Sequence, residues 1–331
     1  MDSCAQQTLN LNSYSSVYPG GSRGGAIPIP GGVIISPTRT WFRGPWTALT
    51  LNNYRGIIMS IKHLTLALCM AMLATSIQAE TLNCTPITSL PATITAQGLY
   101  CLTAKLGTNQ TSGNAITINA NNVTIDLNGW KVDDGSAGTG TQAFGIYSTA
   151  NNVTIKNGIV RGFSFGIELD GSGAVIQDML LDGNTVAGIV TFGTGALVEH
   201  NQIVNTGGST VFSNSNAVGM DLAGSDSTAS DNTVSALTAT GTGGDYGIAI
   251  DGSNNVARNN TVFNNNRPSG GGTAYGISST GSSDIITNNT INNFVYCVYN
   301  IASSDIYSFN TVTDCTNDFT GGTAGASNSG T

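Results

Sequence analysis

The chain has 331 residues, of which 9% are charged and 40% are hydrophobic, and its formal net charge is -8. Soluble domains usually carry about 25% charged residues, so this surface must be polar without being charged. The hydrophobic content argues against a wholly disordered chain. Eleven basic residues against nineteen acidic ones argue against a surface that binds nucleic acid.

Residues 59–79 have the pattern of a secretory signal peptide, with Lys62 before an apolar run and Ile77 and Ala79 before the predicted cleavage site. The apolar run is too short to span a bilayer, so we expect no transmembrane anchor. The pattern predicts a secreted or periplasmic protein. Because residues 1–58 differ in composition from the rest, we interpret them as an upstream stretch translated in error, with an unstructured extension as the alternative.

After the predicted cleavage site, residues 80–331 contain six basic and eighteen acidic residues, a net charge of -12, and four cysteines. An even number of cysteines in an exported chain predicts two disulfides, for which three pairings are possible. The separations of 17 and 18 residues favour pairing Cys84 with Cys101 and Cys297 with Cys315.

A short phrase recurs along the chain, in which an apolar residue is followed by glycine and a second large apolar residue. Clear copies begin at Phe144, Phe165, Ala187, Val218, Tyr246 and Tyr275, and weaker ones at Asn114 and Tyr296. A second phrase places an apolar residue two positions after Asn128, Asn157, Asn201, Asn232, Asn260, Asn289 and Asn310, with Asp178 in the missing copy. Short strands that repeat every 21 to 31 residues cannot each bury an apolar face alone, so the repeats predict eight stacked coils of parallel strands.

The predicted coils have three short strands each, and the Asn residues of the second phrase are expected to stack as an amide ladder at one turn. The aromatic members of the first phrase share the parity of the isoleucines, and we interpret them as core, with a sugar-stacking platform as the alternative. Residues 80–113 lack the repeat and are predicted to cap the coils, which occupy 114–319. The Gly-rich and Ser-rich segment 320–331 is predicted to be a disordered tail.

The phrases Asn122-Val-Thr-Ile-Asp-Leu-Asn-Gly129 and Asn152-Val-Thr-Ile-Lys-Asn-Gly-Ile-Val-Arg-Gly-Phe163 resemble the repeats of right-handed parallel β-helix proteins of the pectin-lyase-like superfamily. The resemblance covers residues 84 to about 318. It implies an all-β fold, a single-stranded right-handed parallel β-helix of about eight coils with an N-terminal cap. That superfamily includes lyases, hydrolases, epimerases, adhesins and phage spikes, so the resemblance implies no single activity. The catalytic phrases of its polygalacturonase-like, epimerase-like and pectate-lyase-like members do not occur in this sequence.

Coil length indicates where a site could form. The longer coils have extra residues at 133–142, 207–216, 239–244 and 268–273, always after the Asn phrase. These residues are expected to leave the coils at one corner, so the two short coils between them should form a notch about 10 Å wide between loop walls.

The residues beside this notch are the candidate site. Arg161 and Asp182 each stand four residues after a ladder position, so we expect them to be neighbours on adjacent coils. With Lys156 they are the candidate catalytic residues, since Lys156 or Arg161 could abstract a proton beside a uronate carboxyl. The candidate binding residues are Asp133, Asp134, Asp178 and Glu168. A Ca²⁺ ion could bridge such carboxylates, and no other cofactor is evident. The alternative is a surface salt bridge between Arg161 and Asp182.

The sequence therefore predicts an exported, monomeric, non-catalytic binding or surface module with a polysaccharide or cell-surface glycan as ligand. The alternative is a lyase-like or epimerase-like enzyme that acts on an acidic polysaccharide. The net charge of -12 after the cleavage site is unfavourable for a polyanionic ligand unless a local positive patch or a bridging cation is present.

Overall fold

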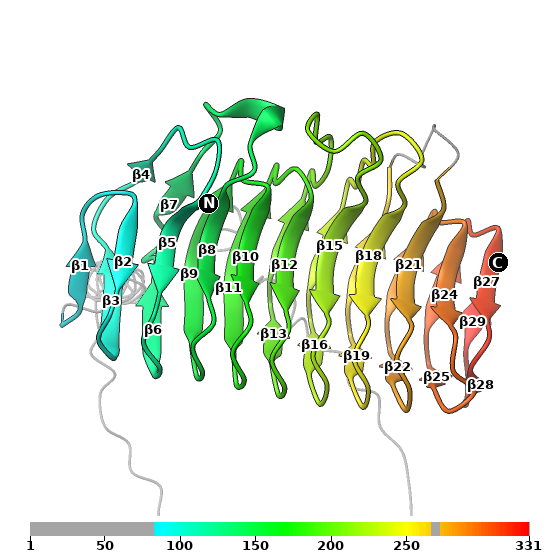
Figure 1. Cartoon of the computed structure of the whole chain (residues 1–331). Helices are drawn as coiled ribbons and strands as arrows, with labels where there is room; N and C mark the ends of the chain where they lie inside the picture. The colour runs from blue at the N-terminus through cyan, green and yellow to red at the C-terminus, as the bar shows by residue number, and fades with distance from the viewer. Residues whose placement is uncertain (1–82, 266–271, 331) are drawn as a thin grey trace, which may run out of the picture. The chain divides into compact units, whose positions relative to one another are not determined.

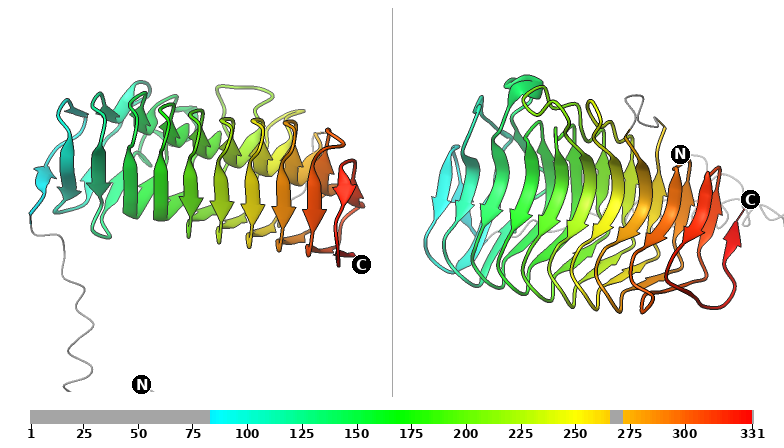
Figure 2. Two further views of the ribbon diagram at one scale, coloured as in Figure 1. Left: turned by 90° about the horizontal axis from the view of Figure 1, so that it is seen from below. Right: turned by 45° about the vertical axis from the view of Figure 1, so that its right-hand side comes forward.

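The computed structural model describes residues 83–265 and 272–330. The predicted signal peptide and the extension before it lie outside the described residues. Within the described residues, no helix is long and apolar enough to cross a membrane. Nearly all regular structure is short parallel strands, and the coils that they form follow one another along a single axis (Figures 1 and 2).

One strand of every coil belongs to a ten-stranded sheet, here called sheet B. Each of its strands pairs in parallel with the strands of the coils before and after it, so the described residues make about nine turns, close to the eight predicted. The strands of sheet B, in spatial order, are β2 (Ala92–Ile94), β5 (Asn114–Ile118), β8 (Phe144–Ser148), β10 (Phe165–Leu169), β12 (Ala187–Thr191), β15 (Ala217–Leu222), β18 (Asp245–Ile250), β21 (Ala274–Ser279), β24 (Tyr296–Asn300) and β27 (Asn317–Thr320).

The other two strands of each coil form sheet A, which has two rows. The first row contains β1 (Thr85–Ile87), β3 (Gly98–Leu102), β6 (Val123–Asp126), β13 (Leu197–Glu199), β16 (Thr228–Ser230), β19 (Val256–Arg258), β22 (Ile285–Thr287), β25 (Ile306–Ser308) and β28 (Thr323–Ala324). The second row contains β4 (Leu106–Gly107), β7 (Lys131–Asp133), β14 (Gln202–Val204), β17 (Thr233–Ser235), β20 (Thr261–Phe263), β23 (Thr290–Asn292), β26 (Thr311–Thr313) and β29 (Ser329–Gly330). Two longer strands, β9 (Thr154–Arg161) and β11 (Val175–Asp182), run through both rows.

The bend between the two rows of sheet A uses one residue with positive φ, followed by a buried position. Asn259 has φ 57° and Asn288 has φ 60°. Asn and Asp tolerate this left-handed conformation better than other non-glycine residues, which explains their frequency here. The next position holds the ladder: the Nδ2 of Asn260 donates to the Oδ1 of Asn289 at 3.0 Å, and the backbone N–H of Asn260 donates to the same oxygen at 2.9 Å.

The amide ladder is confirmed for the later coils and wrong for the earlier ones. It runs without interruption through Asn201, Asn232, Asn260, Asn289 and Asn310 to Asn328. Asn157 and Asp178 instead occupy the exposed positive-φ position one residue before it. The ladder position of their coils holds Gly158 and Met179. A Cβ at Gly158 would lie 2.2 Å from the Cβ of Leu127, so no side chain fits there.

The core lies inside the coils, where the inward side chains of sheets A and B meet. Ile146, Ile167, Ile189, Ile248 and Ile277 of sheet B are fully buried. The registers Ile146–Ile167–Ile189 and Ile248–Ile277 place like residues of successive coils beside one another. Burial of one such side chain stabilises the fold by about 1.5–3 kcal/mol, so the stack of isoleucines is a major source of stability.

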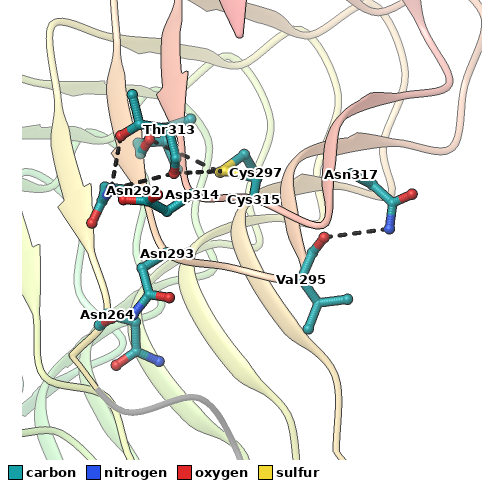
Figure 3. The surroundings of a disulfide bond; sticks show 10 residues. Asn264, Asn292, Asn293, Val295, Cys297, Thr313, Asp314, Cys315 and Asn317 are labelled. Atoms are coloured by element: carbon teal, nitrogen blue, oxygen red, sulfur yellow. Dashed lines mark hydrogen bonds between the residues drawn. A yellow bond between two sulfur atoms is a disulfide. The ribbon is translucent and has the colours of Figure 1, made fainter. Parts of the chain in front are cut away.

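Two disulfides lie near the two ends of the described coils. Cys84 pairs with Cys101 and Cys297 with Cys315, with Cα–Cα distances of 5.7 and 5.9 Å, which confirms the pairing favoured by the spacing. Figure 3 shows the second disulfide, which joins β24 to the segment after β26. Each disulfide therefore ties neighbouring strands of the terminal coils together.

The two end segments differ from the sequence interpretation. Residues 83–113 already carry β1 to β4, which pair with the following coils, so this part of the expected cap is the first coil of the stack. Residues 320–330, expected to be a disordered tail, carry β28 and β29, which pair with β25 and β26. The reason is that Asn328 continues the ladder and accepts a hydrogen bond from the Nδ2 of Asn310 at 3.3 Å, which the Gly and Ser content did not indicate.

We expect Asn260→Ala to lower the free energy of unfolding by about 2–4 kcal/mol, because it leaves the buried N–H groups of Asn232 and the carbonyl of Ala229 without partners. The measurement is urea denaturation followed by circular dichroism. The control is Thr261→Ala, an exposed change in the same segment, which should alter stability by less than about 0.5 kcal/mol. Equal effects of the two substitutions would contradict a stabilising role for the ladder.

Candidate functional site

Three of the four predicted long loops leave the coils at one corner, as predicted, and most of the fourth, 268–273, lies outside the described residues. Residues 134–143, 205–216 and 236–244 connect sheet A to sheet B, while the corresponding connections of two intervening coils, 162–164 and 183–186, are short. Figure 1 shows these loops along the upper edge of the sheets, with the short 3₁₀ helix η3 (Gly138–Gly140) among them.

The two walls of the predicted notch are not separate. The backbone N–H of Thr210 donates to the carbonyl of Thr139 at 3.0 Å, and the two hydroxyls lie 3.5 Å apart. The first loop therefore reaches across the two short coils to the second, and an open notch between the walls is wrong. Two hollows remain beside the first loop, with volumes of about 370 and 160 Å³, and both are lined by Gly135 and Arg161.

The register brings three of the predicted residues into one row of sheet A. Asp133 of β7, Arg161 of β9 and Asp182 of β11 are aligned on successive strands. The Nε of Arg161 lies 3.5 Å from the Oδ2 of Asp182, which confirms that these residues are neighbours. Lys105 and Lys131 both place their Nζ 3.1 Å from the Oδ2 of Asp133.

The two neighbouring aspartates at the start of the first loop have opposite environments. Burial would raise the pKa of Asp133, but the Gly135 N–H and the ammonium groups of Lys131 and Lys105 outweigh burial and lower this pKa to about 2. Burial raises the pKa of Asp134, whose carboxyl accepts hydrogen bonds from the Gln110 N–H and the Thr141 hydroxyl inside the loop. Asp134 is fully buried, so it holds the loop together instead of facing a ligand.

The remaining predicted residues lie elsewhere. Lys156 stands in the first row of sheet A, where its Nζ is 3.5 Å from the Oδ2 of Asp126. Asp178 is exposed at the bend between the two rows, and Glu168 belongs to sheet B. The structure therefore does not bring Lys156, Asp178 and Glu168 to Arg161. Among the described residues, no group of three or more His, Cys, Asp or Glu side chains is arranged to hold a metal ion.

The outer face of sheet B carries aromatic side chains that the sequence pattern predicted to be in the core. Phe144 stacks on Phe165 with ring centroids 4.9 Å apart, and Tyr246, Tyr275 and Tyr296 form a second stack with spacings of 5.0 and 5.4 Å. These side chains are partly exposed and do not belong to the buried core cluster. The expectation that they form core is wrong.

The physical reason is that the glycine and the large apolar residue after each aromatic both face inward. In β10 the burial pattern leaves Phe165 and Glu168 partly exposed, while Gly166, Ile167 and Leu169 are buried. A Cβ at Gly166 would lie 2.6 Å from the Gly188 carbonyl oxygen, so the chain must pack tightly at this corner. Strict alternation is broken there, and the outward positions become the residue before the glycine and the residue two places after the glycine, as in β8, β10 and β15.

The fourth position carries the residues that the sequence analysis missed or could not place. This position, the fourth residue of the recurring phrase, holds Tyr147, Glu168, Asp221 and Tyr299 in β8, β10, β15 and β24. The recurring phrase with this position added, as in Phe-Gly-Ile-Glu168 and Val-Gly-Met-Asp221, was the available signal. Small or aliphatic side chains, Ala187, Val190 and Val218, separate the two aromatic stacks.

Two carboxyl groups on this face, those of Glu168 and Asp221, have a raised pKa. Burial, and next the charge of Asp170, raise the pKa of Glu168 to about 7. Burial, and next the charge of Asp251, raise the pKa of Asp221 to about 7. Asp170 accepts a hydrogen bond from the Tyr147 hydroxyl at 3.0 Å, whereas the buried Oδ1 of Asp221 has no hydrogen-bond partner within the described part of the chain.

Comparison with known proteins found similarity at the level of fold. No family model matches the chain, and no curated protein matches it. Among solved structures, the Dettilon tailspike protein is similar with a TM-score of 0.50 and 16% identity, over 70% of this chain and 54% of the tailspike chain. This chain thus spans about half of the length of that tailspike.

Two further structures resemble the chain more distantly. Endopolygalacturonase I from Stereum purpureum, complexed with two galacturonate, has a TM-score of 0.42 and 12% identity, over 74% of this chain and 92% of the enzyme. The A-module of the mannuronan C-5 epimerase AlgE4 from Azotobacter vinelandii has a TM-score of 0.35 and 14% identity, over 70% and 82% of the two chains. The strand order, the Asn ladder and the likeness to the tailspike together establish the right-handed parallel β-helix of the pectin-lyase-like fold.

Proposed function

We propose that the protein is an exported, non-catalytic carbohydrate-binding module that holds a polysaccharide along the outer face of sheet B. The observation that carries the proposal is the pair of aromatic stacks on one face, Phe144 with Phe165 and Tyr246 with Tyr275 and Tyr296. Aromatic rings offer flat apolar surface to the C–H faces of sugar rings, and tyrosine adds a hydroxyl for hydrogen bonding. Three strand spacings separate Phe165 from Tyr246, which is about 14 Å.

The charge of this face favours a neutral polysaccharide over an acidic one. Glu168, Asp170, Asp221 and Asp251 lie on or beside it, and the described strands of sheet B contain no Lys or Arg. A polyuronate would bring further negative charge next to these carboxylates at a cost in free energy. A neutral chain would instead find hydrogen-bond acceptors for its hydroxyls between two stacking platforms.

The two disulfides support export, because such bonds persist in oxidising compartments. The alternative, a lyase-like or epimerase-like enzyme, would need Lys156 or Arg161 as base. Each is near a carboxylate in sheet A and neither belongs to the strands of the aromatic face, so this arrangement gives the enzyme little support.

One observation favours a second candidate, hydrolysis of a glycosidic bond on the same face. Glu168 and Asp221, with pKa values of about 7, would stay partly protonated near neutral pH, as a general acid must. They stand two strand spacings apart, about 10 Å, close to the separation of the carboxyl pair in inverting glycosidases. Release of reducing ends by the protein, lost in Glu168→Gln, would favour hydrolysis over binding alone.

We expect Tyr275→Ala to weaken binding of a neutral polysaccharide about tenfold, because it removes the central ring of the three-ring stack. Affinity electrophoresis against a panel of soluble neutral and acidic polysaccharides would identify the ligand and measure the loss. The control is Phe309→Ala, which removes an aromatic ring that is 52% exposed at the bend between the two rows of sheet A. Its affinity should equal that of the unmodified protein. No retardation by any neutral polysaccharide, or the same loss in both variants, would contradict the proposal.

We also expect the stability of the protein to fall as the pH rises from 5 to 8. The folded pKa of Asp221 is about 7, above its ordinary value of 3.8, so between these values the folded protein binds a proton that the unfolded chain releases. The contribution of Asp221 to stability is therefore fully present below the ordinary value and is lost as the pH rises through 7.

The measurement is the free energy of unfolding in urea at pH 5, 6, 7 and 8. Asp221→Asn should flatten this dependence by on the order of 2 kcal/mol. Asp226→Asn, an exposed turn residue with φ 58° that Asn also tolerates, should leave the dependence unchanged. An unaltered slope in Asp221→Asn would show that this carboxyl is not the responsible group.

A further inference from the structure

Among the described residues, the basic side chains are concentrated at one place outside sheet B. Lys105, Lys131 and Arg161 are three of the six basic residues in 80–331, a segment with a net charge of -12, and they surround Asp133. Two carboxylates face these three cations at the surface, Asp133 and Asp182. The carboxyl of Asp134, the next residue in the chain, is fully buried and accepts hydrogen bonds inside the loop. The outer part of the cluster therefore has an excess of one positive charge.

A hollow of about 370 Å³ adjoins this cluster and is lined by Lys105, Asp133 and Arg161 together with the small residues Gly107, Gly135 and Ser136. This volume lies within the range of about 300–1,000 Å³ that small-molecule sites occupy. The Ser136 hydroxyl donates to the Thr108 carbonyl at 3.1 Å, which joins two of the residues that line the hollow. A Cβ at Gly162 would lie 2.6 Å from the Gly135 nitrogen, so the loop packs directly on the coil beneath it.

The two cations that line the hollow retain donors for a ligand. Arg161 meets Asp182 through Nε at 3.5 Å, and its side chain is 45% exposed. A guanidinium has five N–H donors, so this contact leaves its terminal nitrogens available for a planar, bidentate acceptor. Lys105 is 56% exposed, and Asp133 is shared with Lys131, so one acceptor oxygen does not occupy the three donors of Lys105.

We propose that this hollow binds a compact organic carboxylate of monosaccharide size, paired with Arg161 and Lys105. The excess of one positive charge fits a monoanion better than a dianion such as phosphate. The hollow lies beside the second row of sheet A, so it is a second site, separate from the aromatic face, for a chemically different group. Because its ligand is charged and its partners are partly exposed, its affinity should fall as ionic strength rises.

The test is titration of the ¹⁵N-labelled protein with D-glucuronate and, in parallel, with D-glucose, which differs in having a hydroxymethyl group instead of the carboxylate. We expect glucuronate, and not glucose, to shift the amide signals of Gly107, Gly135 and Ser136. Arg161→Gln should raise the Kd for glucuronate at least tenfold, and Lys105→Gln should raise it by a smaller factor. Arg258→Gln is the matched control, because it removes an exposed arginine from the first row of sheet A and should leave the Kd unchanged.

Thermal melts of each variant show whether a loss of binding comes from the site or from unfolding of the protein. If Arg161→Gln has a lower melting temperature than the unmodified protein, the exposed Lys105→Gln still tests the site. The proposal is overturned if glucose shifts the same signals equally, or if Arg161→Gln and Lys105→Gln both bind glucuronate as tightly as Arg258→Gln. Tighter binding of inorganic phosphate than of glucuronate would also overturn it, since the hollow would then be a general anion site. Loss of glucuronate binding leaves the aromatic face untouched, so the two sites fail independently.

Discussion

From Asn201 to Asn328, each coil bends between two strands around a buried amide, and that amide must find its partners on the next coil. Asn232 accepts from Asn201, donates to Asn260, and also donates to the Val198 carbonyl at 2.9 Å. A buried amide without these partners would cost about 1–3 kcal/mol for each unsatisfied group, so the coils cannot slip relative to one another without losing the whole column. In these later coils the register, and with it the direction of the outward side chains, depends on this constraint.

Parallel pairing fixes the register in all the described coils, and the column reinforces it from Asn201 onward, so like positions of successive coils form continuous lines on the surface. The aromatic residues before each glycine become stacks with ring spacings near the strand spacing, and the row of Asp133, Arg161 and Asp182 becomes an alternating set of charges. The low charge content has the same origin. Turn and strand hydrogen bonds are satisfied between coils by Asn, Ser and Thr, so solubility does not require many Lys and Glu residues.

The repeat was sufficient to predict the fold and the contact between Arg161 and Asp182, because both depend on coil length, and the cysteine separations were sufficient to predict the disulfide pairing. Two kinds of detail were not accessible. Asn157 lies one residue before the ladder position, which Gly158 occupies. Asn and Gly are each compatible with the positive-φ position and with the ladder position in the sequence pattern, so only the packing of Gly158 against Leu127 shows which residue takes which position. Simple parity failed at Phe165, because two consecutive residues, Gly166 and Ile167, face inward at a tight corner. The contact between Thr139 and Thr210 depends on loop conformation, which no repeat encodes.

The central claim is that the outer face of sheet B is the carbohydrate surface. The most direct test is a crystal structure with an oligosaccharide prepared from the neutral polysaccharide that binds best. We predict that its sugar rings lie on Tyr246, Tyr275 and Tyr296 and extend toward Phe165 across the small side chains between the stacks. Sugar bound on sheet A, or on the loops with the aromatic face empty, would contradict the claim.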